Sequence, residues 1–168
     1  MKDLKSIVLV FAIVAAFVFT ASAQAPIAGL DDGMAALKAQ NGKVVVLAVG
    51  ASWLPLSNKQ AEYTNTLVKK YGGKNVVFFY VVTDSADAKS RNFADDDAVR
   101  KFAAANKLNM AILRDSDGVV VRKNLNVDQV PAFVVIDRDG TQSGAAFGGI
   151  NPKFDITVPI SKKIDSLL

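Results

Sequence analysis

Two unbroken apolar runs constrain the fold of this chain more than any other feature of its sequence. Residues 44–49 read Val-Val-Val-Leu-Ala-Val and residues 76–82 read Val-Val-Phe-Phe-Tyr-Val-Val, with no charged side chain in either run. Such runs are typical of strands covered on both faces, because a strand with one wet face alternates apolar and polar residues. The sequence between them predicts a helix over residues 58–71 that Ser57 caps. We therefore expect a right-handed strand–helix–strand crossover in the middle of a sheet.

The rest of the chain continues this alternation. The acidic residues 95–97 favour a helix that begins there and ends near residue 106. Val130-Pro131 precedes an apolar strand, and the turn at residues 137–140 predicts a hairpin. The further expected elements are a strand over 110–113, a short helix or irregular turn over 119–125, strands over 132–137 and about 141–147, and a closing helix over 152–168. The pattern predicts an α/β fold with a central mixed sheet and helices on both faces.

The first 23 residues have the pattern of a secretory signal peptide. Lys2 and Lys5 precede an apolar run over residues 7–19, and small residues follow up to Ala23, after which we expect cleavage. An uncleaved membrane anchor is the alternative, but a spanning helix needs about 20 apolar residues and this run is shorter. We therefore expect an exported, periplasmic protein with no membrane span after cleavage. Residues 24–41 would form a lead-in with a short helix over 33–40, and residues 42–168 a single domain.

Cysteine and histidine are both absent from the 168 residues. Their absence excludes thiol nucleophiles, disulfides, Ser-His triads and the usual zinc and copper sites. The acidic pairs Asp115/Asp117 and Asp137/Asp139 do not match a calcium loop, and turn-forming hydrogen bonds explain them better. We expect neither a metal nor a cofactor.

The charge of the chain is modest. Lysine and arginine number 20 against 16 aspartate and glutamate residues, a formal net charge of +4. The basic residues are scattered, apart from short pairs such as Lys69-Lys70 and Lys162-Lys163. This distribution argues against a nucleic-acid partner.

Two segments of the chain resemble a known family. Residues 42–57 read Gly-Lys-Val-Val-Val-Leu-Ala-Val-Gly-Ala-Ser-Trp-Leu-Pro-Leu-Ser, and residues 130–140 read Val-Pro-Ala-Phe-Val-Val-Ile-Asp-Arg-Asp-Gly. Together they resemble the exported thioredoxin-like family of TlpA/ResA type, in which a strand ends in Trp-Cys-x-x-Cys and a cis-proline precedes a later strand. The resemblance extends from about Gly42 to Leu168. It implies a thioredoxin-like fold in which Pro131 is cis.

The chain departs from that family at the residues that carry its chemistry. When Trp53 is aligned with the family tryptophan, Leu54 takes the place of the attacking cysteine and Ser57 that of the resolving cysteine. Gln60 stands where ResA-like members have an acidic residue that assists proton transfer. Thiol–disulfide exchange needs a thiolate, which leucine cannot supply. The resemblance therefore implies a redox scaffold with no catalytic residue, and whether the chain is an enzyme stays open.

The former redox motif and the cis-proline loop form the candidate site. In the family, partner peptides lie between these two segments. An exposed apolar patch here would bind a protein or peptide partner. In the alternative interpretation, the tryptophan and both leucines fold inward and the proline shapes the start of the helix. The residues concerned are Trp53, Leu54, Pro55, Leu56, Ser57, Val130 and Pro131.

Three functions remain open from the sequence. The first is a non-catalytic binding or scaffolding module that uses the former active-site groove. The second is a component of a thiol–disulfide oxidoreductase pathway that acts through a cysteine-bearing partner. The third is a structural domain with its contacts elsewhere, for example on the helix that ends at Lys69-Lys70.

Overall fold

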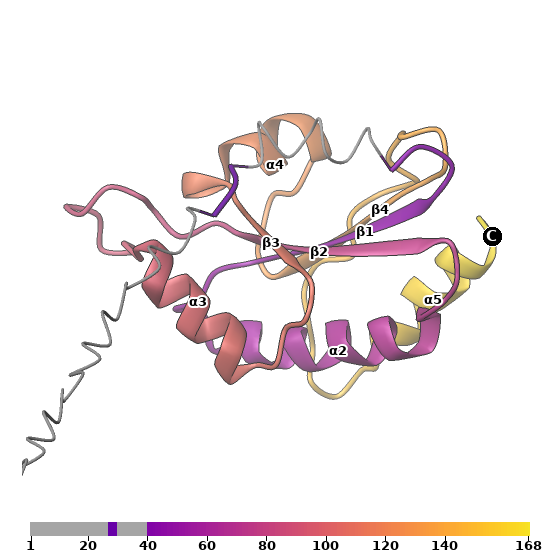
Figure 1. Ribbon diagram of the computed structural model, residues 1–168, viewed down its shortest axis with the longest axis horizontal. Coiled ribbons are helices and arrows are strands. Elements are labelled where there is room, and N and C mark those ends of the chain that lie inside the picture. The colour runs from indigo at the N-terminus through magenta and orange to yellow at the C-terminus, as the bar shows by residue number, and fades with distance from the viewer. Residues whose placement is uncertain (1–26, 30–39) are drawn as a thin grey trace, which may run out of the picture.

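The computed structural model describes residues 27–29 and 40–168. Its four strands form one sheet in the order β3-β2-β1-β4 (Figure 1). β1 (Val44–Gly50) and β2 (Val76–Val82) are the two inner strands and run parallel. β3 (Ala111–Arg114) pairs parallel with β2, whereas β4 (Ala132–Ile136) pairs antiparallel with β1. The sheet is therefore mixed, and the two unbroken apolar runs occupy its centre, as predicted.

Helices cover both faces of this sheet (Figure 1). The cluster of buried side chains on one face includes residues of α2 (Pro55–Tyr71), α3 (Asp96–Ala105) and α5 (Thr157–Asp165). The cluster on the other face includes α4 (Val119–Leu125), which follows a short 3₁₀ turn, η1 (Ser116–Gly118). Within the described residues, no helix has the length and apolar character needed to cross a membrane.

The side chains of β1 explain why its sequence does not alternate. All seven residues of the strand are buried. Successive side chains point to opposite faces of a strand, so both faces of β1 must be apolar when both are covered. Val44, Val46 and Ala48 contribute to the α2 side of the core. Val45, Leu47 and Val49 contribute to the α4 side.

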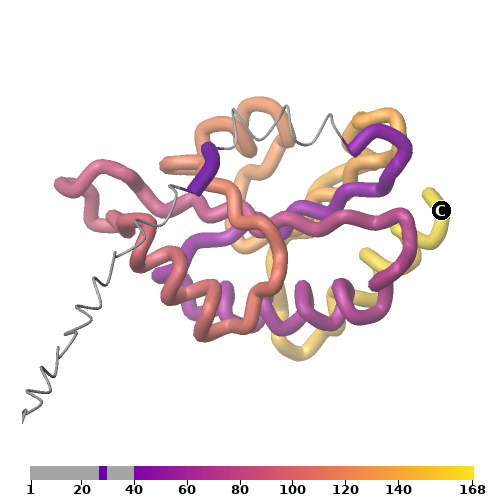
Figure 2. The backbone as a smooth tube through the Cα atoms, in the orientation of Figure 1, coloured from indigo at the N-terminus to yellow at the C-terminus, as the bar shows by residue number. Residues whose placement is uncertain are grey.

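The short segment Ile27–Gly29 extends the sheet beyond β3. The N–H of Arg114 donates to the carbonyl of Ala28 at 2.9 Å, and Gly29 forms a parallel bridge with Arg114. Figure 2 shows this segment beside the end of β3. The expected signal peptide over 1–23 lies outside the described residues, as does the helix expected over 33–40 except for Gln40, which lies in a turn.

Three expected elements differ from the structure. α2 begins at Pro55 rather than residue 58, because Pro55 occupies the first helical turn, where a missing N–H costs nothing. Residues 141–147 do not form a strand; they touch β4 only at two isolated bridges, and between them Gly144 turns the chain away with a φ of +86°. The C-terminal helix is confined to Thr157–Asp165, after a turn at residues 151–156.

Candidate functional site

The loop that leads from β1 into α2 is anchored by a buried carboxylate. Asp84, which follows β2 and is 1% exposed, accepts hydrogen bonds from the N–H of Ser52 at 2.8 Å and from its hydroxyl at 2.5 Å. β1 and β2 are parallel, so the segments that follow them meet at the same edge of the sheet. Asp84 therefore fixes the residue that immediately precedes Trp53.

The apolar residues of this loop remain accessible. Trp53 is 53% exposed and Leu56 is 38% exposed, while Leu54 is half-buried. Trp53 and Leu56 thus do not fold inward, contrary to the alternative interpretation of the sequence. Pro55 does shape the helix start, since it occupies the first turn of α2. An apolar patch at the start of α2 is the result.

The segment before β4 lies beside this patch. The Val130–Pro131 peptide bond is cis, as the resemblance implies. Pro131 is buried and Val130 is half-buried. Among the described residues, the N–H and C=O of Val130 have no hydrogen-bond partner. Val130 therefore presents a free donor and a free acceptor of the main chain next to Trp53.

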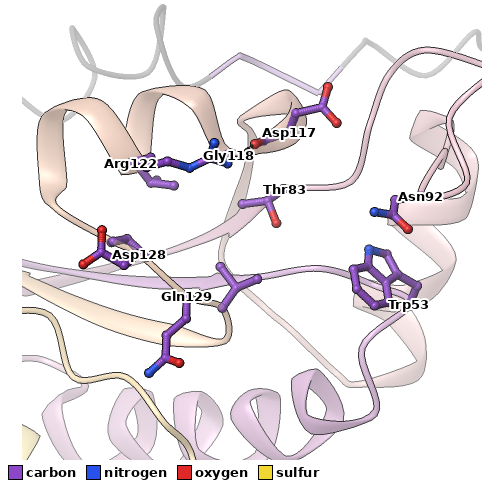
Figure 3. A pocket seen from close by; sticks show the side chains of 11 residues that line it. Trp53, Thr83, Asn92, Asp117, Gly118, Arg122, Asp128 and Gln129 are labelled. Carbon is purple, nitrogen blue, oxygen red and sulfur yellow. Dashed lines mark hydrogen bonds between the residues drawn. The ribbon is translucent and has the colours of Figure 1, made fainter.

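Trp53 and Val130 line one pocket of about 200 Å³ (Figure 3). Its wall comes from four segments: the loop before α2, the loop after β2, the turn that leads into α4 with the start of that helix, and the segment before Pro131. Figure 3 shows the amide of Asn92 near the edge of the Trp53 indole and Thr83 in the middle of the pocket. The remaining lining residues are Asp117, Gly118, Val121, Arg122, Val127, Asp128 and Gln129. The pocket thus has an aromatic wall, valine side chains and several polar groups.

A neutral polar network is buried behind the loop. The amide of Gln60, fully buried, donates to the carbonyls of Val49 at 3.1 Å and Ala132 at 2.7 Å. Its Oε1 accepts from the hydroxyl of Tyr80 at 2.9 Å. Burial raises the pKa of the Tyr80 phenol well above its ordinary value, so this hydroxyl stays a donor. Every polar atom of the Gln60 amide is therefore used within the fold.

Ser57 belongs to the same buried region. The sequence predicted that it caps the helix, and this is wrong, because Ser57 lies inside α2 and is fully buried. Its Oγ accepts a hydrogen bond from the N–H of Ala51 at 3.3 Å. Gly50 is packed so tightly here that a Cβ would lie 2.4 Å from Gln60 Oε1 and 2.6 Å from the Tyr80 hydroxyl oxygen. Ser57 is therefore a packing residue that is inaccessible to a partner.

Sequence reasoning missed Asp84, Tyr80 and the polar lining of the pocket. Asp84 could have been found, because a carboxylate two residues after a buried parallel strand lies at the sheet edge where sites form. Tyr80 gave no signal, since it stands within an apolar run that is explained by burial alone. The pocket lining comes from segments that only the tertiary structure brings together.

The site has surfaces that a ligand could contact, but it has no nucleophile at Leu54, the position of the attacking cysteine in the TlpA/ResA-type family. Leu54 has no ionisable atom, Ser57 is buried, and Gln60 cannot exchange a proton at ordinary pH. What the site offers is an aromatic surface, unpaired peptide groups and a polar pocket.

Comparison with known proteins identifies the family. Residues 6–141 match the AhpC/TSA family. The chain belongs to this family. This AhpC/TSA chain contains no cysteine at any position. No curated protein matches it significantly.

Solved structures similar to this AhpC/TSA chain are thioredoxin-like. A secreted Mycobacterium tuberculosis disulfide oxidoreductase, homologous to E. coli DsbE, is 27% identical with a TM-score of 0.59, over 86% of this chain and 96% of that one. A structure assigned as thiol:disulfide interchange protein DsbE from Chlorobium tepidum is 23% identical with a TM-score of 0.64, over 78% and 84%. A thioredoxin-like protein from Aeropyrum pernix is 20% identical with a TM-score of 0.59, over 75% and 78%. The predicted thioredoxin-like fold is confirmed.

Proposed function

We propose that this AhpC/TSA chain is an exported protein of TlpA/ResA type that binds a peptide segment of a partner protein in the former redox groove without transforming it. The observation that carries this proposal is the free main-chain donor and acceptor of Val130 beside the exposed indole of Trp53. The chain keeps a place for an extended peptide and lacks the atom that would react with it.

The mode of binding follows from these groups. An extended peptide segment pairs its own N–H and C=O with those of Val130, in the manner of a strand added at a sheet edge. One of its side chains enters the pocket of about 200 Å³ between Trp53 and Val130. Main-chain pairing supplies affinity, and the pocket supplies specificity.

Turnover is prevented at two positions. Leu54 cannot attack a disulfide, and it offers an apolar contact to the bound segment instead. Gln60 is neutral and holds the carbonyls of Val49 and Ala132, so it fixes the floor of the groove rather than moving a proton. The residue next to Pro131 is therefore tied to β1 through a side chain.

Two observations support export. The first 23 residues have the composition of a signal peptide that is cleaved after Ala23. The M. tuberculosis disulfide oxidoreductase, which aligns over most of both chains, is a secreted protein.

Site-specific photo-crosslinking in the exporting cell tests this function. A photoreactive side chain replaces Leu54 in one variant and Val119 in another. Val119 is a matched control, because it is an apolar residue, 57% exposed, on α4. We expect a discrete protein adduct from position 54 at about ten times the yield from position 119, as expected for a difference of about 1.4 kcal/mol in local binding. Equal yields from both positions, or no adduct from position 54, would contradict the proposal.

The same experiment separates the alternative function. In one outcome, the adduct from position 54 contains a cysteine-bearing segment of the partner. If that partner also exchanges its disulfide only in the complex, the result would indicate a role in a thiol–disulfide oxidoreductase pathway. An adduct with a segment that contains no cysteine would indicate a binding or scaffolding module.

A further inference from the structure

The helices α2 and α5 are far apart in the sequence and lie side by side in the fold (Figure 1). The hydroxyl of Tyr71 donates to the carbonyl of Ser161 at 3.0 Å and to Oδ1 of Asp165 at 2.8 Å. Lys70 Nζ lies 3.8 Å from Oδ2 of Asp165. Lys70 and Lys162 also line the same surface hollow of about 380 Å³. Lys70 and Lys162, one from each pair, therefore belong to one surface.

We define the basic face as residues 59–74 and 151–165, which are α2 after its first turn, the following turn, and α5 with the turn before it. It carries seven lysines and three acidic residues, a net charge of +4. This equals the formal net charge of the entire chain, so the remaining residues balance one another. The lysines are Lys59, Lys69, Lys70, Lys74, Lys153, Lys162 and Lys163, and the acidic residues are Glu62, Asp155 and Asp165.

Two large apolar side chains protrude from the same face. Phe154 is 58% exposed and Val158, four residues later, is 64% exposed. The loop that presents Phe154 is tied to α2, because the hydroxyl of Tyr63 donates to the Phe154 carbonyl at 3.3 Å. This hydrogen bond thus holds the segment of Phe154 against the middle of α2.

We propose that the basic face binds peripherally to the surface of a bilayer that contains anionic lipids. Lysine ammonium groups interact with the lipid phosphates as point charges, and apolar side chains between them insert at the boundary of headgroups and acyl chains. Phe154 and Val158 are the inserting side chains. The charge on the face complements an anionic surface, and its lysines extend along two helices rather than around one pocket.

The composition of the face favours lipid over an acidic protein. All seven of its cations are lysines, and it holds no arginine. Protein interfaces are depleted in lysine and enriched in arginine, because the planar guanidinium pairs with carboxylates in fixed geometry. Binding to the phosphates of a fluid lipid surface does not need a fixed pairing geometry, so lysine ammonium groups are suited to it.

This surface leaves the groove accessible. Trp53 precedes α2, whereas Lys69 and Lys70 lie in its last turn. With 17 residues, α2 is roughly 25 Å long, so the groove and most of the lysines lie at opposite ends of it. The chain can therefore bind a peptide while it rests on a membrane.

Vesicle sedimentation tests the proposal with the full chain. The vesicles contain phosphatidylcholine alone, or phosphatidylcholine with about one third phosphatidylglycerol. The test variant is Lys69→Glu/Lys162→Glu. The control is Lys89→Glu/Lys123→Glu, which changes the net charge equally at two exposed lysines outside the basic face. The N-terminal apolar run is present in all proteins, so differences between variants report on the substituted lysines.

We expect the parent chain and the control to bind the anionic vesicles within about twofold of each other, and the test variant to bind at least about tenfold more weakly. Added salt should reduce binding of the parent. Val158→Ser should weaken binding about threefold to fivefold, and Val119→Ser, on the α4 face, should not.

Three results would overturn the proposal. One is equal loss in the two double variants, which would indicate that only overall charge matters. Another is binding of the Lys69→Glu/Lys162→Glu variant to anionic vesicles that is as strong as binding of the parent chain. The third is no vesicle binding by a chain that binds soluble poly-glutamate through the same lysines, which would indicate an acidic protein partner.

Discussion

At the scale of single residues, the site depends on polar groups that are buried and fully paired. Gln60 satisfies two carbonyls and one hydroxyl. A buried polar group left without a partner costs about 1–3 kcal/mol, so each member of this network is needed by the others. The core beneath Trp53 thus holds a set of fixed hydrogen bonds.

Tyr80→Phe tests this network through its pH dependence. At pH 8 we expect a loss of about 1–3 kcal/mol in the free energy of unfolding, because Gln60 Oε1 loses its donor. Burial raises the pKa of Tyr80 in the folded state. The Tyr80 hydroxyl therefore stabilises the fold fully below about pH 10, the pKa of a tyrosine in the unfolded chain. This stabilisation is lost as the pH rises above that value. The gap between parent and variant should shrink by about 1.4 kcal/mol by pH 11.

Urea unfolding at pH 8 and pH 11 measures this change. The other two tyrosines remain in both proteins, so their titration cancels in the comparison. A gap that stays constant or widens with pH would contradict a buried, protonated Tyr80.

At the scale of elements, two buried carboxylates, those of Asp84 and Asp115, hold the starts of helices in place. Asp84 holds the loop before α2 through Ser52. Asp115, 3% exposed, accepts from the N–H groups of Val120 at 3.0 Å and Val121 at 2.8 Å, and so caps α4 from within the core. Asp84 stands two residues after β2, and Asp115 directly follows β3.

Asp115→Ala should be more destabilising than a change at an exposed cap. We expect it to lower the free energy of unfolding by about 2–3 kcal/mol, because two buried N–H groups lose their acceptor. Asp95→Ala is the control. Its exposed carboxylate accepts from the N–H of Ala98 at 2.7 Å, and its loss should cost about 1 kcal/mol. Chemical denaturation of both variants decides this, and equal costs would mean that burial at α4 contributes nothing.

At the scale of the whole molecule, β1 joins the two cores into one cooperative unit. Leu47 is completely buried (0% exposed) and packs on the α4 side of the sheet. We expect Leu47→Ala to cost about 2–5 kcal/mol and to lower the stability of both faces together. Circular dichroism and the fluorescence of Trp53, the one tryptophan of the chain, should then report the same urea midpoint. Different midpoints would show that the two faces unfold separately.

The sequence by itself determined the order of elements and the missing chemistry. Unbroken apolar runs at β1 and β2 are required when helices cover both faces, so local composition is enough to predict them. The absence of cysteine, and with it of any thiol nucleophile, can be read directly from the sequence. The start of α2 and the role of Ser57 were predicted incorrectly, because Pro55 and Ser57 both suit a helix start and only the packing against Gly50 and Gln60 chooses between them.

Only the tertiary structure decided which distant residues share a surface. The pocket beside Trp53 combines segments near residues 53, 83, 117 and 130, and the basic face combines lysines about 90 positions apart. Hydropathy patterns report whether a side chain is buried, and they carry no information on which exposed side chains become neighbours. That choice depends on how the helices pack across the sheet, and it places the groove before the first turn of α2 and Lys69 and Lys70 in the last turn of that helix.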